Sequence, residues 1–242
     1  MRLFCVKIET IYKSKNIYKM ENAECRLYLG CMFAGKTEEM LRQVRRARIA
    51  GIPCVIVKYA NDNRYGDSST VTTHDGMALT GGKDLRVVQA RTLGEVKLSP
   101  KEKVIAVDEG QFYPDLPFIV DKWMKEGRKV YVAALDGTYQ RKPFGKIGEL
   151  IPLCTHVVKL HAICMVCKER HASYTLRTVE SDEIELIGGT DQYMAACLPC
   201  YITKTERPGM IRQTPIYNPE KSPLIKSNAS RDLSDEFDNF DL

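Results

Sequence analysis

The sequence contains no long hydrophobic run. No stretch of its 242 residues approaches the roughly 18 consecutive apolar residues that a membrane-spanning helix requires. Near the amino terminus, only a four-residue apolar stretch from Leu3 to Val6 precedes Lys7, which is too short for the core of a signal peptide. We therefore expect a protein that is neither secreted nor membrane-bound, and we place it in the cytoplasm.

Repeats and nucleic-acid-binding patterns are also missing. No segment of the chain repeats with the period of roughly 20 to 50 residues that is typical of solenoids and propellers. The net charge of +5 is a modest excess, and no stripe of basic and aromatic residues accompanies it. Four arginines gather in one expected helix, and we interpret them as a solvated face rather than a nucleic-acid contact: Arg42, Arg45, Arg46 and Arg48.

The chain does contain short apolar runs that alternate with helical patterns. Apolar residues between Leu116 and Met124 recur at the spacing of one helix face, and Gly127 ends this pattern. A second helix is expected after Gly35, ending near Gly51. Strands are expected at 27–29, 53–58, 85–89, 103–109, 129–135 and 157–160. Strands that alternate with helices predict an α/β fold, in which helices cover both faces of a parallel sheet.

The remaining segments divide the chain. Residues 60–84 are polar and indicate a long loop or lid, and 174–179 with 183–187 indicate a hairpin. We expect four parts: a flexible extension at 1–24, an α/β domain at 25–160, a small domain at 161–203 and a disordered tail at 204–242.

One segment matches a nucleotide-binding motif at every fixed position. Glycines let backbone N–H groups turn around phosphate oxygens at a helix N-terminus, which favours anions. Lys36 would bring a positive charge to the β- and γ-phosphates, and Thr37 would offer its hydroxyl to Mg²⁺. The pattern G-x-x-x-x-G-K-[ST] is met, between an expected strand and an expected helix, by Gly30, Cys31, Met32, Phe33, Ala34, Gly35, Lys36 and Thr37.

Two neighbouring carboxylates follow another strand. Asp108 comes directly after the apolar run 104–107, so we expect it to hold Mg²⁺ together with Thr37. Glu109 could serve as a general base in two ways. In a motor-type ATPase it would activate water, and in a small-molecule kinase it would take the proton of a substrate hydroxyl. The pair does not separate these alternatives, and a non-catalytic binding module would leave both carboxylates without a role.

Nine cysteines are present, and four of them form the pairs Cys164/Cys167 and Cys197/Cys200. Without a secretion signal this spacing favours a metal over disulfides, and four thiolates suit a closed, structural Zn²⁺ site. A disulfide or redox role is the alternative. The segment between the pairs could close over a flat ligand or form a zinc ribbon that packs on a partner. The other five follow no spacing rule, and we interpret them as small apolar fillers rather than reactive thiols: Cys5, Cys25, Cys31, Cys54 and Cys154.

Further segments extend these motifs into a family pattern. They are Thr73-His74-Asp75, 108–112, 133–145 and Ile187-Gly188-Gly189, which combine with 30–37 and both cysteine pairs. With them, residues 25–203 resemble the cellular-type (type II) thymidine kinases. The resemblance implies a P-loop (RecA-like) parallel sheet flanked by helices, with a small zinc-containing lasso domain. It also implies transfer of the ATP γ-phosphate to the 5′-hydroxyl of thymidine, giving dTMP in the salvage pathway, with deoxyuridine as a related substrate.

The same resemblance implies residue roles. Glu109 would be the general base, and Thr37 with Asp108 would serve Mg²⁺. Beyond the loop at 30–37, ATP would contact Asp62, Asn63, Arg64, Asp108, Glu109, Gly110 and Gln111. Thymidine would contact Met32, Phe112, Leu135, Tyr139, Thr175, Ile184, Glu185, Leu186, Ile187, Gly188 and Tyr193. Tyr139 departs from the family pattern, which usually has phenylalanine there.

The resemblance carries expectations about partners as well. Members of this family usually form homotetramers and are feedback-inhibited by thymidine triphosphate (dTTP). We expect both properties here, together with Mg²⁺ bound with ATP, a structural Zn²⁺, and no nucleic-acid or membrane partner.

Overall fold

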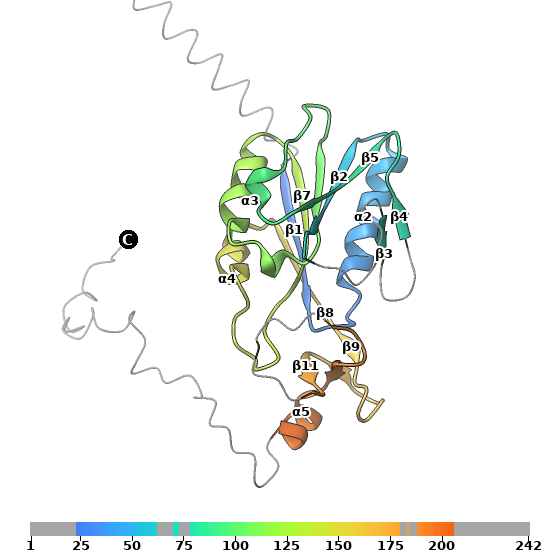
Figure 1. The fold of residues 1–242 in the computed structure, drawn as a ribbon, viewed down its shortest axis with the longest axis vertical. Coiled ribbons are helices and arrows are strands. Elements are labelled where there is room, and N and C mark those ends of the chain that lie inside the picture. Colours follow the sequence, from blue (N-terminus) through green and yellow to red (C-terminus); the bar gives the residue numbers. More distant parts are fainter. Residues whose placement is uncertain (1–22, 62–69, 73–77, 180–182, 184–187, 206–242) are drawn as a thin grey trace, which may run out of the picture. The chain divides into compact units, whose positions relative to one another are not determined.

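A computed structural model describes residues 23–61, 70–72, 78–179, 183 and 188–205 (Figure 1). Most of the extension predicted at 1–24 and most of the tail predicted at 204–242 lie outside these residues. In the described remainder, Glu24 begins strand β1 (Glu24–Gly30), and Lys204 and Thr205 end helix α5 (Leu198–Thr205). No helix of the described ranges combines the length and the apolar character that crossing a membrane would require.

Six strands form the central sheet in the order β5-β2-β6-β7-β1-β8, and every pairing between them is parallel. This confirms the predicted α/β fold. Because all strands run the same way, the loops that leave β1, β6 and β7 emerge at one edge of the sheet. The strands are β1 (Glu24–Gly30), β2 (Cys54–Tyr59), β5 (Leu85–Ala90), β6 (Val104–Val107), β7 (Lys129–Leu135) and β8 (His156–Leu160).

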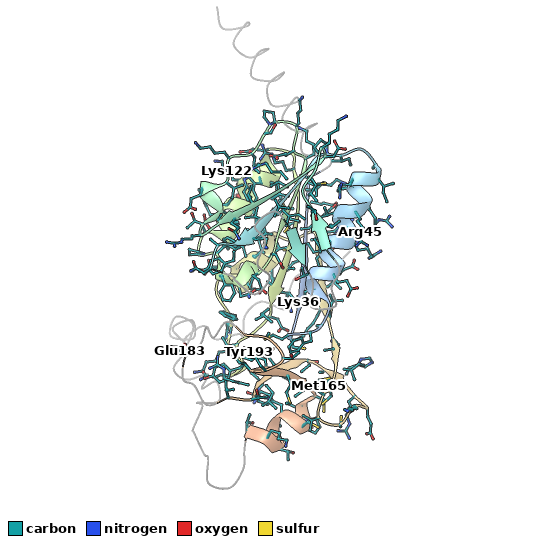
Figure 2. The ribbon with its side chains drawn as sticks, turned by 45° about the vertical axis from the view of Figure 1, so that its right-hand side comes forward. Lys36, Arg45, Lys122, Met165, Glu183 and Tyr193 are labelled. Atoms are coloured by element: carbon teal, nitrogen blue, oxygen red, sulfur yellow. The ribbon has the colours of Figure 1, made fainter. Side chains whose placement is uncertain are left out.

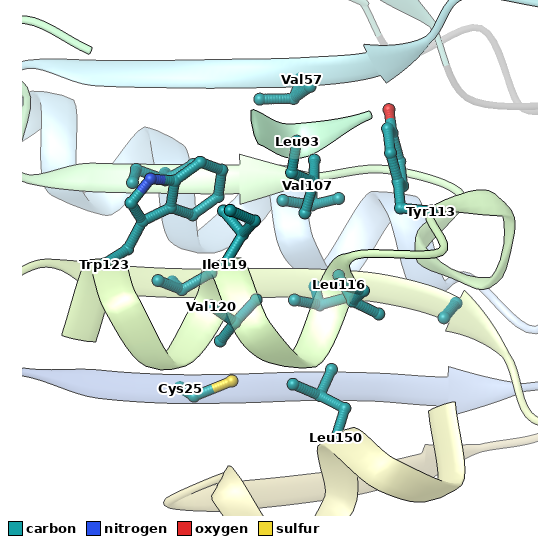
Figure 3. Packing of buried hydrophobic residues seen from close by; sticks show 14 of the residues in the cluster. Cys25, Val57, Leu93, Val107, Tyr113, Leu116, Ile119, Val120, Trp123 and Leu150 are labelled. Atoms are coloured by element: carbon teal, nitrogen blue, oxygen red, sulfur yellow. The ribbon is translucent and has the colours of Figure 1, made fainter. Parts of the chain in front are cut away.

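Helices cover both faces of the sheet (Figure 1). Helix α2 (Lys36–Ile49) buries Met40, Leu41 and Val44 against one face. Helices α3 (Leu116–Lys125) and α4 (Ile147–Leu150) cover the other. Successive residues of a strand point to opposite faces, so Tyr28 of β1 packs with α2 while its neighbours Leu27 and Leu29 pack with α3 and α4. Figure 3 shows α3 lying on its strands through Leu116, Ile119, Val120 and Trp123.

Helix α2 has the ends that its sequence predicts. Glu38 and Glu39 occupy its first turn and two arginines its last turn, which suits the helix dipole. Gly51 then adopts a left-handed φ of 71°. Its N–H donates to the carbonyl of Arg48 and the N–H of Ile52 donates to that of Ala47, which satisfies two carbonyls at the helix end.

Two connecting segments differ from the sequence-based expectations. Within the predicted loop at 60–84, β3 (Thr70–Thr72) pairs antiparallel with β4 (Ala78–Thr80). In the cysteine-bearing part, β11 (Tyr174–Arg177) pairs with β12 (Tyr193–Ala196). The sequence predicted 183–187 as the partner of this strand, but Glu183 lies in no strand and residues 184–187 lie outside the described ranges. The alternating polarity of 174–179 and 183–187 predicted two strands joined as a hairpin. Which strands pair, however, depends on which segments the fold places side by side.

Shorter elements complete the described chain. The small pair β9 (Ala162–Ile163) and β10 (His171–Ala172) precedes β11, and α5 (Leu198–Thr205) follows β12. Single turns of 3₁₀-helix are η1 (Leu93–Glu95), η2 (Gly110–Phe112) and η3 (Ile151–Leu153). The division into domains at residues 160 and 161 stays a prediction.

Tyr113 provides a test of the core. Its side chain is fully buried (Figure 3), and its hydroxyl has no hydrogen-bond partner within the described part of the chain. Removing an unpaired buried hydroxyl relieves its desolvation penalty, so Tyr113→Phe should raise the free energy of unfolding by about 1–3 kcal/mol. For a chain of this size the Tm should rise by roughly 2–10 °C in a thermal melt.

Tyr131 is the matched control, because its hydroxyl donates to Glu24 Oε1 at 3.2 Å. Tyr131→Phe should lower the Tm, since it removes a hydrogen bond worth about 0.5–1.5 kcal/mol. Equal losses of Tm in the two variants would show that the Tyr113 hydroxyl is paired in solution.

Candidate active site and metal centre

The phosphate loop leaves the carboxyl end of β1. Gly30 has a φ of 152°, and a Cβ built on it would lie 2.5 Å from the carbonyl oxygen of Leu160, so no larger residue fits without a backbone shift. Phe33 and Gly35 also have positive φ values, 64° and 76°, which turn the loop before α2 begins at Lys36. The sequence-predicted cradle is therefore a sharply turned segment between a strand and a helix, as anion binding by backbone N–H groups requires.

Lys36 lies over this loop. Its Nζ donates to the carbonyl oxygen of Cys31 at 2.8 Å. Burial lowers the pKa of Lys36, while the carboxylates of Glu109, Asp108 and Asp136 oppose this effect by favouring its charged form. The loop thus places the Lys36 amine among carboxylates that favour its charged form, at the edge of the sheet, and Figure 2 shows where Lys36 lies.

Thr37 and Asp108 meet although strand β7 separates their strands in the sheet. The hydroxyl of Thr37 donates to Asp108 Oδ1 at 2.8 Å, and the backbone N–H of Glu109 donates to the same oxygen at 3.1 Å. A hydroxyl beside a carboxylate is an oxygen donor set that suits Mg²⁺. The two residues fit the predicted Mg²⁺ site, which stays a prediction.

Glu109 is held by Gln111. Its backbone is left-handed, with a φ of 53°. Gln111 Nε2 donates to Glu109 Oε2 at 2.6 Å, and Gln111 Oε1 accepts the backbone N–H of Leu135 at 3.0 Å. Gln111 is buried, with 3% of its surface exposed. Its amide therefore ties the Glu109 carboxylate to the end of β7.

Two glycines leave the room that Gln111 needs. A Cβ on Gly110 would lie 2.6 Å from Val132 Cγ1. A Cβ on Gly145 would lie 2.1 Å from the carbonyl oxygen of Gln111. The segment around Gly145 therefore packs directly on the backbone that positions Glu109.

Residues predicted to bind the substrate fall into two groups. In the first, the backbone N–H of Met32 donates to Thr175 Oγ1 at 3.0 Å, which joins the phosphate loop to β11. In the second, the Arg177 guanidinium lies 3.8 Å from the centre of the Tyr139 ring and donates to the Tyr193 hydroxyl at 2.8 Å. Arg177 thus links two predicted substrate residues.

Phe112 lies beside the predicted base. Its ring stacks on Tyr59 with centroids 4.9 Å apart and meets Phe144 edge-on at 5.5 Å. These contacts fix the orientation of η2, which also carries Gln111.

The four paired cysteines come together. Their sulfur atoms all lie within 4.8 Å of one another, and those of Cys167 and Cys197 are 4.0 Å apart. A tetrahedral zinc ion with Zn–S bonds of about 2.3 Å separates its sulfurs by about 3.8 Å, so the cluster could hold such a metal. Within the described ranges this metal-capable group consists of the four cysteines, and neither His161 nor His171 belongs to it.

The chemistry of the cluster also suits a metal. Burial raises the pKa of Cys164, but backbone N–H groups of Cys167, Cys197 and Val166 outweigh it and lower that pKa to about 6. A hydrogen bond from the backbone of Cys200 lowers the pKa of Cys197. Because the thiolate is the form that binds metals, both environments favour coordination.

Comparison with known proteins decides the family. A family model described as Thymidine kinase matches residues 23–201. The thymidine kinase of Vaccinia virus (strain Western Reserve) is 46% identical over 184 residues, which span 76% of this chain and 99% of the viral protein. The thymidine kinases of Variola virus (isolate Human/India/Ind3/1967) and Rabbit fibroma virus (strain Kasza) are 44% and 43% identical, over 76% and 75% of this chain and 99% and 98% of theirs. The chain belongs to the thymidine kinase family.

This membership confirms the resemblance inferred from the sequence, and the protein is a kinase. The matched range begins before β1 and ends after Cys200, so it includes both the phosphate loop and the cysteine cluster. Some predicted thymidine kinase residues are not described: Asp62, Asn63, Arg64, Ile184, Glu185, Leu186 and Ile187. Gly188 is described, and a Cβ on it would collide with the side chain of Gln192.

Two thymidine kinase residues have roles that the sequence does not reveal. The sequence predicts no role for Arg177, because a single cation within a strand has no local signature. Gln111 is predicted only to border the ATP site, yet it holds Glu109. Its place directly after Asp108-Glu109-Gly110 is the only sequence signal that could have suggested this contact.

Metal content tests whether the cysteine cluster binds zinc. We expect about one zinc per purified chain, and we expect Cys164→Ser to lose it, because a hydroxyl replaces one of the four thiolates. Cys54→Ser is the control, since Cys54 lies in β2 and not in the cluster, and its thiol donates to the carbonyl of Ile52 at 3.1 Å. Elemental analysis after gel filtration measures the ratio. Full zinc occupancy in Cys164→Ser would contradict the assignment.

Proposed function

We propose that this chain transfers the γ-phosphate of ATP to the 5′-hydroxyl of thymidine, giving dTMP in nucleoside salvage, and that it also accepts deoxyuridine. The observation that carries the proposal is the placement of Glu109. Its carboxylate is fixed by Gln111 beside the Thr37–Asp108 pair, at the edge of the sheet from which the phosphate loop leaves.

Phosphate binding falls to the loop at 30–37. Its backbone N–H groups, at the start of α2, would surround the phosphate oxygens, and Lys36 would exchange its contact with Cys31 for the β- and γ-phosphates. Thr37 and Asp108 would hold Mg²⁺, which when bound neutralises charge on the phosphates. The residues of this phosphate-binding region would neutralise the charge of ATP and orient it without forming a covalent bond to it.

Proton removal falls to Glu109. The 5′-hydroxyl of thymidine must lose its proton as its oxygen bonds to the γ-phosphorus, and a carboxylate within hydrogen-bond reach can accept that proton. Gln111 holds this carboxylate through Oε2, which fixes its orientation at the edge of the sheet. Asp108 accepts through Oδ1 from Thr37 and from the Glu109 backbone, which suits its proposed role beside Mg²⁺.

Nucleoside binding falls to residues around β11 and β12. Met32, Thr175, Tyr139 and Tyr193, together with Phe112 and Leu135, would surround the base. Two observations support this assignment. Met32 contacts Thr175, and the Arg177 guanidinium lies over the rings of both Tyr139 and Tyr193. A structural Zn²⁺ in the cysteine cluster would hold these strands in place, since β12 leads directly into Cys197.

Assembly and regulation are proposed from the family resemblance alone. We expect a cytoplasmic homotetramer that dTTP inhibits by occupying the substrate site. Light scattering gives the assembly state, and initial rates with added dTTP test the inhibition.

The general base is tested by Glu109→Gln, which keeps the hydrogen bond to Gln111 possible but cannot accept a proton. Turnover of thymidine should fall by about 10²–10⁴-fold, while ATP affinity changes little. Glu149→Gln, at an exposed carboxylate paired with Lys146, should keep normal turnover. The rates are measured with each of the four deoxynucleosides and with deoxyuridine. Near-normal turnover in Glu109→Gln, or no preference for thymidine and deoxyuridine, would reject the proposal.

The support of Glu109 is tested by Gly145→Ala. Its new methyl group would collide with the Gln111 backbone, and the left-handed φ of 51° adds strain. A displacement of about 1 Å at a catalytic group can cost about 10²-fold in rate, so we expect a loss of that order in turnover. Gly148→Ala is the control, because nothing lies within 4 Å of its Cβ position. Similar turnover in both variants would show that the packing of Gly145 on Gln111 does not affect catalysis.

A further inference from the structure

Two cysteines outside the metal cluster lie in contact. Cys25 is in β1 and Cys154 follows η3, 129 positions later, yet their sulfur atoms are 3.4 Å apart. Figure 3 shows the Cys25 sulfur on the face of the sheet that α3 and α4 cover. The sequence predicted apolar fillers at both positions, because no spacing rule connects them.

The backbone around this pair is fixed by Thr155. The N–H of Cys25 donates to Thr155 Oγ1 at 3.2 Å, and the N–H and hydroxyl of Thr155 both donate to the carbonyl oxygen of Cys25, each at 2.9 Å. The N–H of Cys154 donates to the carbonyl of Ile151 at 3.1 Å. Three hydrogen bonds therefore join β1 to the residue just before β8, next to the sulfurs, and the β1–β8 pairing continues from this point.

The two thiols are not equivalent. Cys25 is completely buried, whereas Cys154 is half-buried. The hydrogen bond with Cys154 is the main cause that raises the pKa of Cys25, followed by burial. The same bond lowers the pKa of Cys154. This contact favours the charged form of Cys154 over that of Cys25, and the Cys154 thiol also donates to the carbonyl oxygen of Leu150 at 3.3 Å. An accessible thiolate beside a second thiol is typical of redox-sensing cysteines.

Two other buried thiols also contact backbone carbonyls, but their pKa values are raised rather than lowered. Cys31 donates to the carbonyl of Ala172 at 3.4 Å, and Cys54 donates to that of Ile52 at 3.1 Å. Burial raises the pKa of Cys31, and it raises the pKa of Cys54 to about 11. Both thiols are thus protonated and shielded, so they are poor nucleophiles.

We propose that Cys25 and Cys154 form a reversible oxidation site that closes to a disulfide when a hydroperoxide reacts with Cys154. The Cys154 sulfur attacks one oxygen of hydrogen peroxide, and an S–O bond forms as the O–O bond breaks. The departing hydroxide takes up the proton that the Cys154 thiol releases and becomes water. The Cys25 sulfur then attacks the sulfenic acid at Cys154. An S–S bond forms, the S–O bond breaks, and the Cys25 proton leaves with the oxygen as a second water. The thiols lose two electrons and the peroxide gains them.

Closure requires little movement. A disulfide bond is about 2.05 Å long, so the sulfurs must approach by about 1.4 Å from their separation of 3.4 Å. A thiol reductant would reverse the reaction by exchange.

The site lies at the amino end of β1, whereas the phosphate loop leaves its carboxyl end at Gly30. The disulfide would tie β1 to the turn before β8 and close a loop of about 130 residues, which restricts the unfolded chain strongly. We therefore expect oxidation to raise the Tm by on the order of 10 °C. Kinase turnover should stay within about twofold. The inference thus stands apart from the proposed function, and failure of one leaves the other intact.

The test treats the zinc-loaded, full-length protein with hydrogen peroxide, blocks remaining thiols by alkylation, and maps disulfide-linked peptides by mass spectrometry. We expect a Cys25–Cys154 link that dithiothreitol removes, and the Tm rise should appear and disappear with it. In Cys25→Ala, which removes the second thiol, dimedone should trap a sulfenic acid at Cys154. Cys54→Ser serves as the control and should form the link normally.

Several outcomes would overturn the proposal. These are the absence of the link, a link from Cys154 to Cys5 instead, or release of zinc before the link forms. Equal alkylation rates of Cys154 and Cys54 in the reduced protein would also contradict it, because the nucleophilic character of Cys154 would then be missing. If Cys25→Ala unfolds, the alkylation rates and the peptide map of the wild-type protein still test the proposal.

Discussion

The parallel pairing of β1 with β7, and of β7 with β6, places the loops of three strands at one edge of the sheet. The hydrogen bond from Thr37 to Asp108 depends on this arrangement, because the two residues are 71 positions apart and have no local reason to meet. Apolar strands buried on both faces hold the pairing, and the helices supply the surfaces that bury them. Displacing either strand along the sheet would separate the hydroxyl from the carboxylate, so the core fixes the geometry of the phosphate and cation site.

Close packing extends that rigidity to the candidate base. Gly145 lies against the Gln111 backbone, Gln111 bonds both Glu109 and the end of β7, and Gly110 fits against Val132. These contacts leave Glu109 little freedom, and its left-handed backbone is maintained by the structure around it. The carboxylate is thus oriented before any ligand arrives. Such preorganisation is the condition under which a single general base is effective.

The cysteine cluster and the phosphate loop share one buried group of side chains. Cys31 and Ala34 of the loop pack with Cys164, Leu176 and Cys197, and the hydrogen bond from Met32 to Thr175 crosses the same region. A metal held by the four thiolates would therefore stabilise strands that touch the loop. This contact gives a physical reason why a closed metal site, with no free coordination position, can matter for a nucleotide enzyme.

Much of the fold and half of the site follow from the sequence. The loop at 30–37, the carboxylates of 108 and 109, and the cysteine pairs are contiguous motifs, and the alternation of strands and helices predicted the parallel sheet that the structure contains. Other features depend on residues far apart in the chain. The partner of β11, the support of Glu109 by Gln111 and Gly145, the role of Arg177 and the contact of Cys25 with Cys154 are examples. Local patterns report backbone preference and binding chemistry, because both act over a few neighbouring residues. Which distant side chains meet is decided by strand order and packing, and only the tertiary structure contains that information.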